Sequence, residues 1–255
     1  GHLCTLCTDG KYSRAVKLRC QKGSFLESLI VTLFSSFIRF KKYSQYVDLF
    51  IAPSIFSHTI HKKTLSNSTH LHHFNYNYTD KTKFVKKDAG NLPFALFVGR
   101  IERNKGIKLM VDAFVKLNYP LKIIGDGNYK EEIIVHCNND HAPNITFEGF
   151  KSKDEINDYY ESALFTIIPS QWYEVFGLTI LESFSFKKPV VAADIGAIPE
   201  IVEDKKSGLL FNPFDLDDLI FKIDFMFNNI TSVKEMGNYA YEKCLNKFSK
   251  YQYYE

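Results

Sequence analysis

Two carboxylates eight positions apart, Glu174 and Glu182, flank a predicted turn between a strand and a helix. The strand is expected over 163–168, an apolar run rich in β-branched and aromatic residues that ends at Pro169. The helix is expected over 177–186, and its first N–H groups, which lack partners within the helix, favour an anion. Because open α/β sheets bind ligands at the carboxyl ends of their strands, we expect both carboxylates to border a ligand site.

Two cations follow an earlier predicted strand and should reach the same edge of the sheet. Arg100 and Lys105 come after the apolar run 94–98, and glycine-bearing turns follow later strands at 125–127 and 149–150. At ~5 Å and an effective dielectric of ~20, each pair of unit charges is worth roughly 3 kcal/mol before desolvation costs. Two cations and a helix terminus therefore suit a diphosphate better than a single carboxylate.

The carboxylates are better used on sugar hydroxyls than beside phosphates, because hydroxyls offer paired hydrogen-bond donors. Glu174 and Glu182 could hold two sugars, one on either side of a diphosphate. The alternative is that both are solvated residues on a helix surface, and the spacing alone leaves both interpretations open.

Strands and helices alternate from Leu92 onward. The predicted strands are 94–98, 121–124, 144–147, 163–168, 189–193 and 208–211. One predicted helix is opened by Lys105-Gly106 and runs to 117, and another is capped by Ser152 and Glu155. The other predicted helices are 129–137, 177–186, 215–227 and 232–248, and a turn is predicted at 194–200. This βαβ order predicts an α/β fold with a doubly wound parallel sheet.

The preceding segment should begin with a helix over 24–46, because Ser24 and Glu27 have the spacing of a capping box. Its apolar residues recur at helical spacing and could pack in a core. Alternatively, with Arg39, Lys41 and Lys42 near its end, the helix could touch anionic lipid at the inner face of the cytoplasmic membrane.

The rest of this segment contains a predicted strand at 47–52 and a helix from Ser54 to about 64. His70, His72 and His73 could bind a metal but are interpreted as loop histidines, because no carboxylate or cysteine accompanies them. The polar stretch 79–91 is interpreted as a linker. We therefore predict two domains, one over 1–88 that includes the linker and one over 89–255.

The amino-acid composition argues against some classes of function. A net charge of +3, from 32 basic and 29 acidic residues, is too small to indicate a nucleic-acid partner. Five cysteines, an odd number spread unevenly, do not form a disulfide framework, so a reducing cytoplasmic setting is expected. Cys4, Cys7 and Cys20 could form a zinc knuckle with His2 or an upstream residue, or they could be reduced thiols of a surface loop.

Taken in order, four motifs resemble the donor domain of the family 4 glycosyltransferases. They are Gly99-Arg100 to Lys105-Gly106, Gly125-Asp126-Gly127, Glu174-x7-Glu182 with Phe176-Gly177-Leu178, and Gly196 to Glu200 in Gly-Ala-Ile-Pro-Glu. The resemblance covers Leu92 to the C-terminus and implies a retaining enzyme of the two-Rossmann-domain, B-type fold. Residues 4–52 resemble the later part of the acceptor domain in bacterial members with a CxxC loop. The resemblance thus implies an incomplete acceptor-side domain with its linker over 1–88 and a donor-binding domain over 89–255.

The resemblance also implies roles for individual residues. Arg100 and Lys105 would neutralise the donor diphosphate, Glu182 would bind the ribose hydroxyls, and Glu174 would hold the donor sugar. Backbone contacts to phosphate and sugar are implied for Phe176, Gly177 and Leu178, and the nucleotide pocket would be lined by Gly99, Gly125, Asp126, Gly127 and Phe150. Val175 departs from the small residue that often follows the first glutamate in this family.

The mechanism implied by this resemblance is electrostatic and needs no metal. Cations and N–H dipoles would stabilise the charge that builds on the departing β-phosphate, in a reaction that moves a hexose from a nucleotide-diphosphate sugar to a glycan or lipid-linked acceptor of the cell envelope. The family's acceptor domain supplies several strands and a catalytic-region His upstream of this chain. We therefore expect an N-terminally truncated chain that binds the donor nucleotide and transfers sugar poorly or not at all.

Three rivals remain at the level of sequence. A nucleotide-sugar epimerase or phosphorylase could share the architecture, although the spacing of the two glutamates argues against it. A non-catalytic nucleotide-sugar-binding fragment is favoured by truncation. A nicotinamide dehydrogenase is disfavoured, since no G-x-G-x-x-G opens a helix after a strand.

Overall fold

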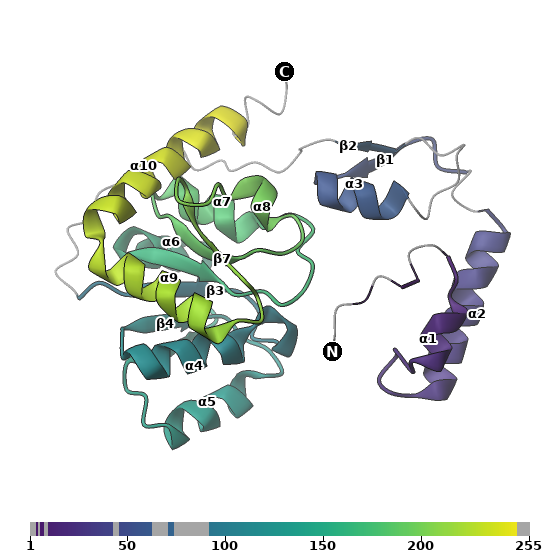
Figure 1. Ribbon diagram of the computed structural model, residues 1–255, viewed down its shortest axis with the longest axis horizontal. Coiled ribbons are helices and arrows are strands. Elements are labelled where there is room, and N and C mark those ends of the chain that lie inside the picture. The colour runs from purple at the N-terminus through teal and green to yellow at the C-terminus, as the bar shows by residue number, and fades with distance from the viewer. Residues whose placement is uncertain are drawn as a thin grey trace. The chain divides into compact units, whose positions relative to one another are not determined.

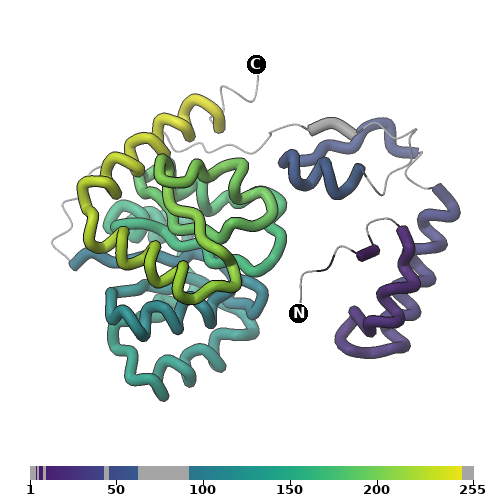
Figure 2. The backbone as a smooth tube through the Cα atoms, in the orientation of Figure 1, coloured from purple at the N-terminus to yellow at the C-terminus, as the bar shows by residue number. Residues whose placement is uncertain are grey.

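The chain divides into two compact units, Gly1–Asn75 and Tyr76–Glu255, and each is considered by itself. The computed structural model describes residues 4, 6–7, 10–42, 46–62, 71–73 and 92–248 (Figures 1 and 2). The predicted linker at 79–91 lies outside these residues. Across the described ranges, no helix combines the length and the apolar character needed to cross a bilayer.

The first unit contains three helices and two short strands in the part that is described. They are α1 (Ser13–Lys17), α2 (Phe25–Phe40), β1 (Phe50–Ala52), α3 (Ile55–Lys62) and β2 (Leu71–His73). Ser24 caps α2 as predicted, since its hydroxyl accepts the Glu27 N–H at 3.3 Å. Ser54 likewise caps α3 by accepting the Ser57 N–H at 3.1 Å.

The structure corrects two predictions in this unit. Helix α2 ends at Phe40 instead of 46, and its apolar face is exposed, with Leu33 at 61% and Phe34 at 64%. The prediction that this helix packs in a core is therefore wrong for the described unit, and its contact with lipid stays a prediction. His72 and His73 form strand β2, parallel to β1, instead of a loop. Three residues are too few to show a strand period, and His70 lies outside the described residues.

The second unit is a parallel sheet of six strands in the order β5-β4-β3-β6-β7-β8. The strands are β3 (Ala95–Val98), β4 (Leu121–Ile124), β5 (Ile145–Gly149), β6 (Phe165–Ile168), β7 (Val190–Ala193) and β8 (Gly208–Phe211). Their side chains are mostly buried, and all four residues of β7 are. Apolar runs without alternation are typical of parallel strands covered on both faces, and the predicted doubly wound sheet is confirmed.

Helices cover both faces of this sheet (Figure 1). They are α4 (Ile107–Leu117), α5 (Lys130–Asn139), α6 (Lys153–Ser162), α7 (Leu178–Ser185), α8 (Ile198–Ile201), α9 (Leu216–Asn228) and α10 (Ile230–Lys247), with the 3₁₀ turn η2 (Arg103–Lys105) before α4. Helix α4 packs against α5 and α9, and α10 packs against α7. The predicted capping box is complete: Ser152 accepts the Glu155 N–H at 3.4 Å and donates its own N–H to the Glu155 carboxylate at 2.8 Å.

Most element boundaries lie within two residues of the predicted ones. The predicted turn 194–200 contains the one-turn helix α8, in which Pro199 occupies the first turn and pre-sets the helical φ. Strand β5 runs through Gly149, because the Gly149 carbonyl accepts the Gly125 N–H at 2.9 Å. Helix α10 begins at Ile230, two residues before the predicted start.

Candidate functional site

The turns that follow β3, β4 and β5 are joined by backbone hydrogen bonds at the carboxyl edge of the sheet. The Gly99 N–H donates to Ile124 at 3.0 Å, and the Gly125 N–H donates to Gly149 at 2.9 Å. The turn from Asp126 to Gly127 is tied to β3 in the same way, since the Ile101 N–H donates to Asp126 at 2.9 Å. The glycine-bearing turns predicted to share one edge therefore form a continuous surface there.

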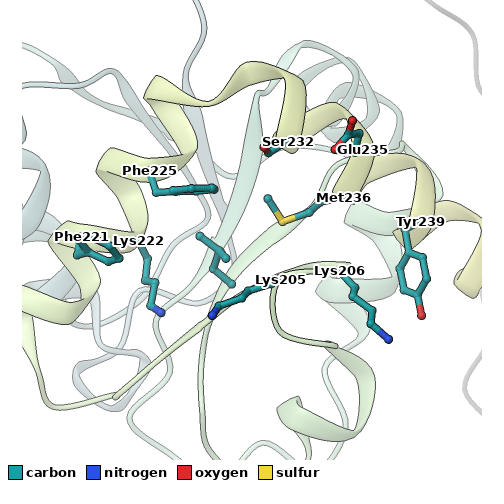
Figure 3. A pocket seen from close by; sticks show the side chains of 10 residues that line it. Lys205, Lys206, Phe221, Lys222, Phe225, Ser232, Glu235, Met236 and Tyr239 are labelled. Atoms are coloured by element: carbon teal, nitrogen blue, oxygen red, sulfur yellow. The ribbon is translucent and has the colours of Figure 1, made fainter.

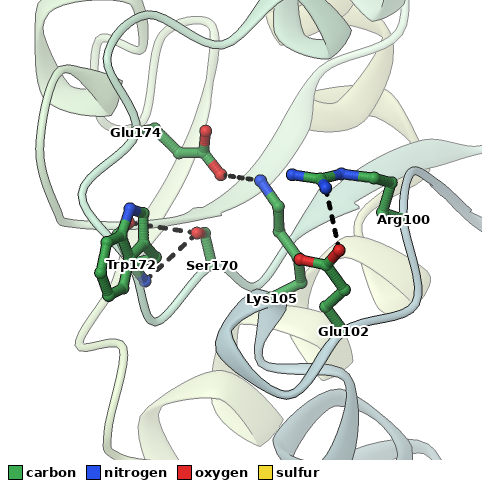
Figure 4. A network of polar contacts seen from close by, with 6 residues as sticks. All are labelled: Arg100, Glu102, Lys105, Ser170, Trp172 and Glu174. Atoms are coloured by element: carbon green, nitrogen blue, oxygen red, sulfur yellow. Dashed lines mark hydrogen bonds and ion pairs between the residues drawn. The ribbon is translucent and has the colours of Figure 1, made fainter. Parts of the chain in front are cut away.

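Lys105 and Glu174, from segments 69 positions apart, form an ion pair at this edge (Figure 4). The Lys105 ammonium donates to the Glu174 carboxylate at 2.5 Å, and the two side chains are 25% and 20% exposed. Lys105 ends η2 after β3, and Glu174 lies in the loop between β6 and α7, so the adjacent strands β3 and β6 bring them together. A predicted phosphate-binding cation thus touches a predicted sugar-binding carboxylate.

Two glycines hold the backbones on either side of this pair. Gly106, next to Lys105, has a φ of +68°, and a Cβ there would lie 1.8 Å from the Pro169 carbonyl oxygen. Gly196 has a φ of +63°, and a Cβ there would lie 2.6 Å from the Glu174 carbonyl oxygen. Any L side chain would be strained at both positions and would push the loops apart. The pair is therefore positioned by close backbone packing.

Arg100 lies at the open side of the same group. Its guanidinium donates to the Glu102 carboxylate at 2.9 Å, and its side chain is 73% exposed (Figure 4). Glu102 was not anticipated from the sequence, because a carboxylate two residues after a cation carries no distinguishing pattern. Arg100 is thus a solvated charge at the rim, in contrast to the half-buried Lys105.

Glu182 lies one helical turn into α7 and is held from a different direction. The buried Tyr160 hydroxyl, from α6, donates to the Glu182 carboxylate at 3.1 Å. Burial and the adjacent Glu182 charge raise the pKa of the Tyr160 phenol well above its usual value. The Tyr160 ring stacks on Phe186 with centroids 5.4 Å apart, which fixes the donor. Glu182 is thus an oriented, partly buried carboxylate instead of a solvated helix residue.

The segment between the two glutamates starts α7. Gly177 is the N-cap residue, with a φ of +119°, and the free N–H groups of the first turn follow it. Phe176 is buried and contacts the Phe248 ring edge-on at 6.0 Å, whereas Val175 and Leu178 are half exposed. The start of α7 therefore combines the first N–H groups of a helix with two half-exposed apolar side chains.

The predicted nucleotide-pocket residues occupy the turns after β4 and β5. Asp126 accepts the Gly127 N–H through its carboxylate at 2.8 Å and lies 3.6 Å from Lys130. Phe150, directly after β5, is 82% exposed and offers a bare aromatic ring. Such a ring can stack on a planar base.

Two further residues at this edge were missed by sequence reasoning. Trp172, the only tryptophan of the chain, is 51% exposed and lies two positions before Glu174. Its backbone is held by Ser170, whose hydroxyl accepts the Trp172 N–H at 3.3 Å and donates to the Trp172 carbonyl at 3.1 Å. Asn104 precedes Lys105 and has a buried Oδ1 without a hydrogen-bond partner among the described residues. The uniqueness of the tryptophan was a usable signal; for Asn104 there was none.

The cysteines of the first unit do not form a metal site within the described residues. Cys4, Cys7 and Cys20 are free thiols, and burial with Cys20 nearby raises the pKa of the Cys7 thiol. No group of three or more His, Cys, Asp or Glu side chains in the described ranges is arranged to hold a metal ion. His2, the proposed fourth ligand, lies outside those ranges.

One Asp-x-Asp sequence, a pattern that can hold a divalent cation, occurs at 215–217. The Asp215 carboxylate is used as the N-cap of α9, where it accepts the N–H groups of Asp217 and Asp218 at 3.0 Å. Asp215 thus has a structural role as the N-cap of α9.

Together, the carboxyl edge offers two cations, two differently held carboxylates, a helix N-terminus and two exposed aromatic rings. Chemically, this set can neutralise a diphosphate, accept hydrogen bonds from two sets of hydroxyls and stack on planar groups.

Comparison with known proteins agrees with this arrangement. The family model described as Glycosyl transferases group 1 matches residues 79–243. An uncharacterized glycosyltransferase of Methanocaldococcus jannaschii is 31% identical over 176 residues, which cover 66% of this chain and 50% of that protein. O-antigen chain mannosyltransferase C of Escherichia coli is 28% identical over 146 residues, which cover 56% of this chain and 39% of that protein. The chain thus spans about half of these relatives or less.

Among solved structures, Anabaena HepE in complex with UDP matches with a TM-score of 0.74 at 18% identity, covering 88% of this chain and 72% of that one. At this identity the likeness is one of fold. It shows the B-type fold that was predicted from the motifs.

Proposed function

Because the chain belongs to the group 1 glycosyl transferases, we propose that it moves a hexose from a nucleotide-diphosphate sugar to a glycan or lipid-linked acceptor, with retention of anomeric configuration. The contact between the Lys105 ammonium and the Glu174 carboxylate carries this proposal. It joins a cation suited to phosphate and a carboxylate suited to sugar hydroxyls, so the bond between sugar and diphosphate would lie beside both. Transfer in cell-envelope glycan synthesis is supported by the O-antigen mannosyltransferase relative.

The remaining residues divide the donor between them. The Glu182 carboxylate, oriented by Tyr160, would accept hydrogen bonds from the ribose hydroxyls. Arg100 and the free N–H groups at the start of α7 would meet the diphosphate with Lys105, and Phe150 would stack on the base. HepE binds UDP on the same fold, which supports a uridine diphosphate donor.

In the proposed step, the bond between the anomeric carbon and the β-phosphate oxygen breaks, and the bonding electron pair stays with the phosphate. The acceptor hydroxyl oxygen forms the new bond on the same face, and its proton passes to the leaving phosphate. Lys105 and the α7 N–H groups are already in place when this charge develops, and such preorganised donors stabilise the transition state without reorganising. We propose that these groups make a divalent cation unnecessary.

The first test measures nucleotide binding through the intrinsic fluorescence of Trp172, which lies two residues from Glu174. We expect saturable quenching or enhancement by UDP, with GDP as the comparison that identifies the base. A chain whose tryptophan signal and calorimetric heat are unchanged by either nucleotide contradicts the site. Products formed from a radiolabelled nucleotide sugar then separate transfer, epimerisation and binding without turnover.

A sharper test addresses Glu182. We expect the wild type to bind UDP about tenfold more tightly than 2′-deoxy-UDP, because a charged hydrogen bond is worth about 1.5–3 kcal/mol. Glu182→Gln should lose most of this preference, and Glu161→Gln, a change in a neighbouring partly buried glutamate of α6, should keep it. A preference that survives Glu182→Gln would assign the ribose to another residue.

A further inference from the structure

A cavity of about 600 Å³ lies at the outer edge of the second unit, away from the candidate site (Figure 3). It is enclosed by the loop before β8, by β8 itself and by α9 and α10. Lys205 and Lys206 directly precede β8, so the cavity lies near the amino end of that strand. The candidate site lies at the carboxyl ends of the strands, on the opposite edge of the sheet. A volume of this size is within the usual range of roughly 300–1,000 Å³ for ligand sites.

The charged residues lining the cavity are three lysines and one glutamate, Glu235, so the lining has a net charge of +2 (three minus one). Lys205 is exposed, and its ammonium has no hydrogen bond or ion pair within the described part of the chain. Lys206 and Lys222 form long ion pairs, at 3.5 Å from Glu203 and 3.8 Å from Asp218. Each ammonium also lies 5.9 Å from an aromatic ring, that of Tyr239 for Lys206 and that of Phe221 for Lys222. The lining therefore has cationic capacity that the protein itself leaves largely unused.

The Glu203 carboxylate does not neutralise this capacity. Lys243 donates to it at 2.7 Å, and the Tyr239 hydroxyl donates to it at 2.7 Å as well. Lys206, at 3.5 Å, is the most distant of these three partners. An anion entering the cavity can therefore recruit Lys206 while Glu203 keeps its other two partners.

Four apolar side chains, those of Leu209, Phe221, Phe225 and Met236, also line the cavity. Leu209 of β8 and Met236 of α10 are each 5% exposed, and Phe225 of α9 lies across from Met236 (Figure 3). Methionine is flexible and polarizable, so it adapts to ligands of irregular shape. An apolar interior with cations at its rim matches a molecule that has an apolar body and one anionic group.

We propose that this cavity binds a small organic anion with an apolar chain, of the alkyl carboxylate or alkyl phosphate class. The chain would lie against Leu209, Phe225 and Met236, and the anionic group would pair with Lys205 and Lys206. This site is independent of nucleotide binding at the carboxyl edge.

Isothermal titration of the full chain with four probes below their micellar concentrations tests the proposal. Decanoate and decyl phosphate should each bind with a stoichiometry of one, and their relative affinities identify the preferred anionic group. Decyl maltoside, which has the same chain and a neutral head, should bind at least about tenfold more weakly. Inorganic phosphate, which has no chain, should give no saturable heat.

The matched variants are Lys205→Gln and Lys234→Gln. Both lysines are exposed, and Lys234 lies on α10 but does not line the cavity. Lys205→Gln should weaken the better decyl anion about tenfold, whereas Lys234→Gln should change its affinity less than about twofold. Equal affinity for decyl maltoside and the decyl anions would overturn the proposal, as would equal effects of the two variants.

Competition separates this site from the proposed donor site. Decanoate should leave the Trp172 fluorescence and the UDP affinity unchanged, because Trp172 lies at the opposite edge of the sheet. If decanoate displaces UDP, its binding site is the carboxyl edge and the cavity assignment is wrong. If UDP does not bind but the decyl anions do, the proposed function fails and the cavity assignment stands.

Discussion

Two lysine–glutamate pairs of the second unit have similar geometry and different surroundings. The Lys105–Glu174 contact is 2.5 Å and the Lys243–Glu203 contact is 2.7 Å. Glu203 also accepts from the Tyr239 hydroxyl and has Lys206 nearby, and these contacts join the loop before β8 to α10. Among the residues that the structure describes, Glu174 has Lys105 as its one ion-pair partner, and it lies in a loop at the carboxyl edge of the sheet.

This difference distinguishes a pair that stabilises the fold from one that is available for binding. The Lys243 side chain is 6% exposed, and removing its charge leaves the one-third-exposed Glu203 carboxylate with two of its three partners. Lys105 and Glu174 are 25% and 20% exposed, so both can exchange their mutual contact for a ligand. Desolvation makes the breaking of a buried pair costly, and solvent access reduces that cost.

The largest expected effect is on nucleotide binding by Lys105→Ala. We expect UDP affinity to fall about 100-fold, because the variant loses a phosphate-binding cation and leaves the Glu174 charge beside the diphosphate. Calorimetry or Trp172 fluorescence gives the dissociation constant.

A double variant tests the cause of this loss of UDP affinity. Lys105→Ala combined with Glu174→Gln should recover part of the affinity, since the uncompensated carboxylate has been neutralised. Lys243→Met, which removes the lysine of the other pair, should bind UDP like the wild type. Equal losses in Lys105→Ala and Lys243→Met would mean that the two pairs do not differ as described.

The second largest effect is on stability, and it is expected for the Lys243–Glu203 pair. Lys243→Met should lower the free energy of unfolding by about 2 kcal/mol, less than the roughly 3–5 kcal/mol typical of a fully buried pair, because Glu203 is one-third exposed and keeps two partners. Urea unfolding should show a lower midpoint with an unchanged slope. Lys105→Ala should shift the midpoint by less than half as much; a larger shift would give that pair a structural role.

The pH dependence of stability tests the same pair without changing Lys243. Hydrogen bonds from Lys243 and Tyr239 lower the pKa of Glu203 from its usual 4.5 to about 2. Because the folded-state pKa is the lower one, the stabilisation is complete above pH 4.5 and is lost as the pH falls toward 2. The difference in urea midpoint between wild type and Glu203→Gln should therefore be constant above pH 5.5 and shrink below about 4.5. A difference that stays constant down to pH 3 would contradict the lowered pKa.

Much of the donor-side fold could be predicted from the sequence, because its strands are apolar runs bounded by glycine or proline. β4 and β8 have the predicted boundaries, and the parallel order alone places Arg100, Lys105 and the two glutamates at one edge. The pairing of Lys105 with Glu174 could not be predicted, since it depends on β6 lying beside β3. Neither could the role of Tyr160, which requires knowing which face of α6 meets α7.

The first unit was less predictable for a related reason. Periodicity located α2, but a repeat of apolar residues at helical spacing says that a helix has an apolar face and does not say what covers it. β2 contains three residues, so its existence depends on pairing with β1 and on no local pattern. The sequence thus predicts a helix or strand best when both faces of the element are buried and the element is several residues long.

The smallest expected effect concerns Arg100, which lies at the rim of the Lys105–Glu174 pair. Its side chain is 73% exposed and already bonded to Glu102, so Arg100→Gln should weaken UDP binding only about three- to tenfold. Most of this loss should disappear as salt is raised from about 0.05 M to 0.5 M, because exposed charges are screened within a few ångströms at high ionic strength. The matched control is Arg103→Gln: Arg103 is 69% exposed, pairs with Glu132 and lies over the Tyr129 ring, outside the predicted site. It should leave UDP affinity within about twofold at every salt concentration. If Arg100→Gln and Glu182→Gln both bind UDP like the wild type, the carboxyl edge is not the nucleotide site. The partly exposed Lys105–Glu174 pair would then have a role other than nucleotide binding.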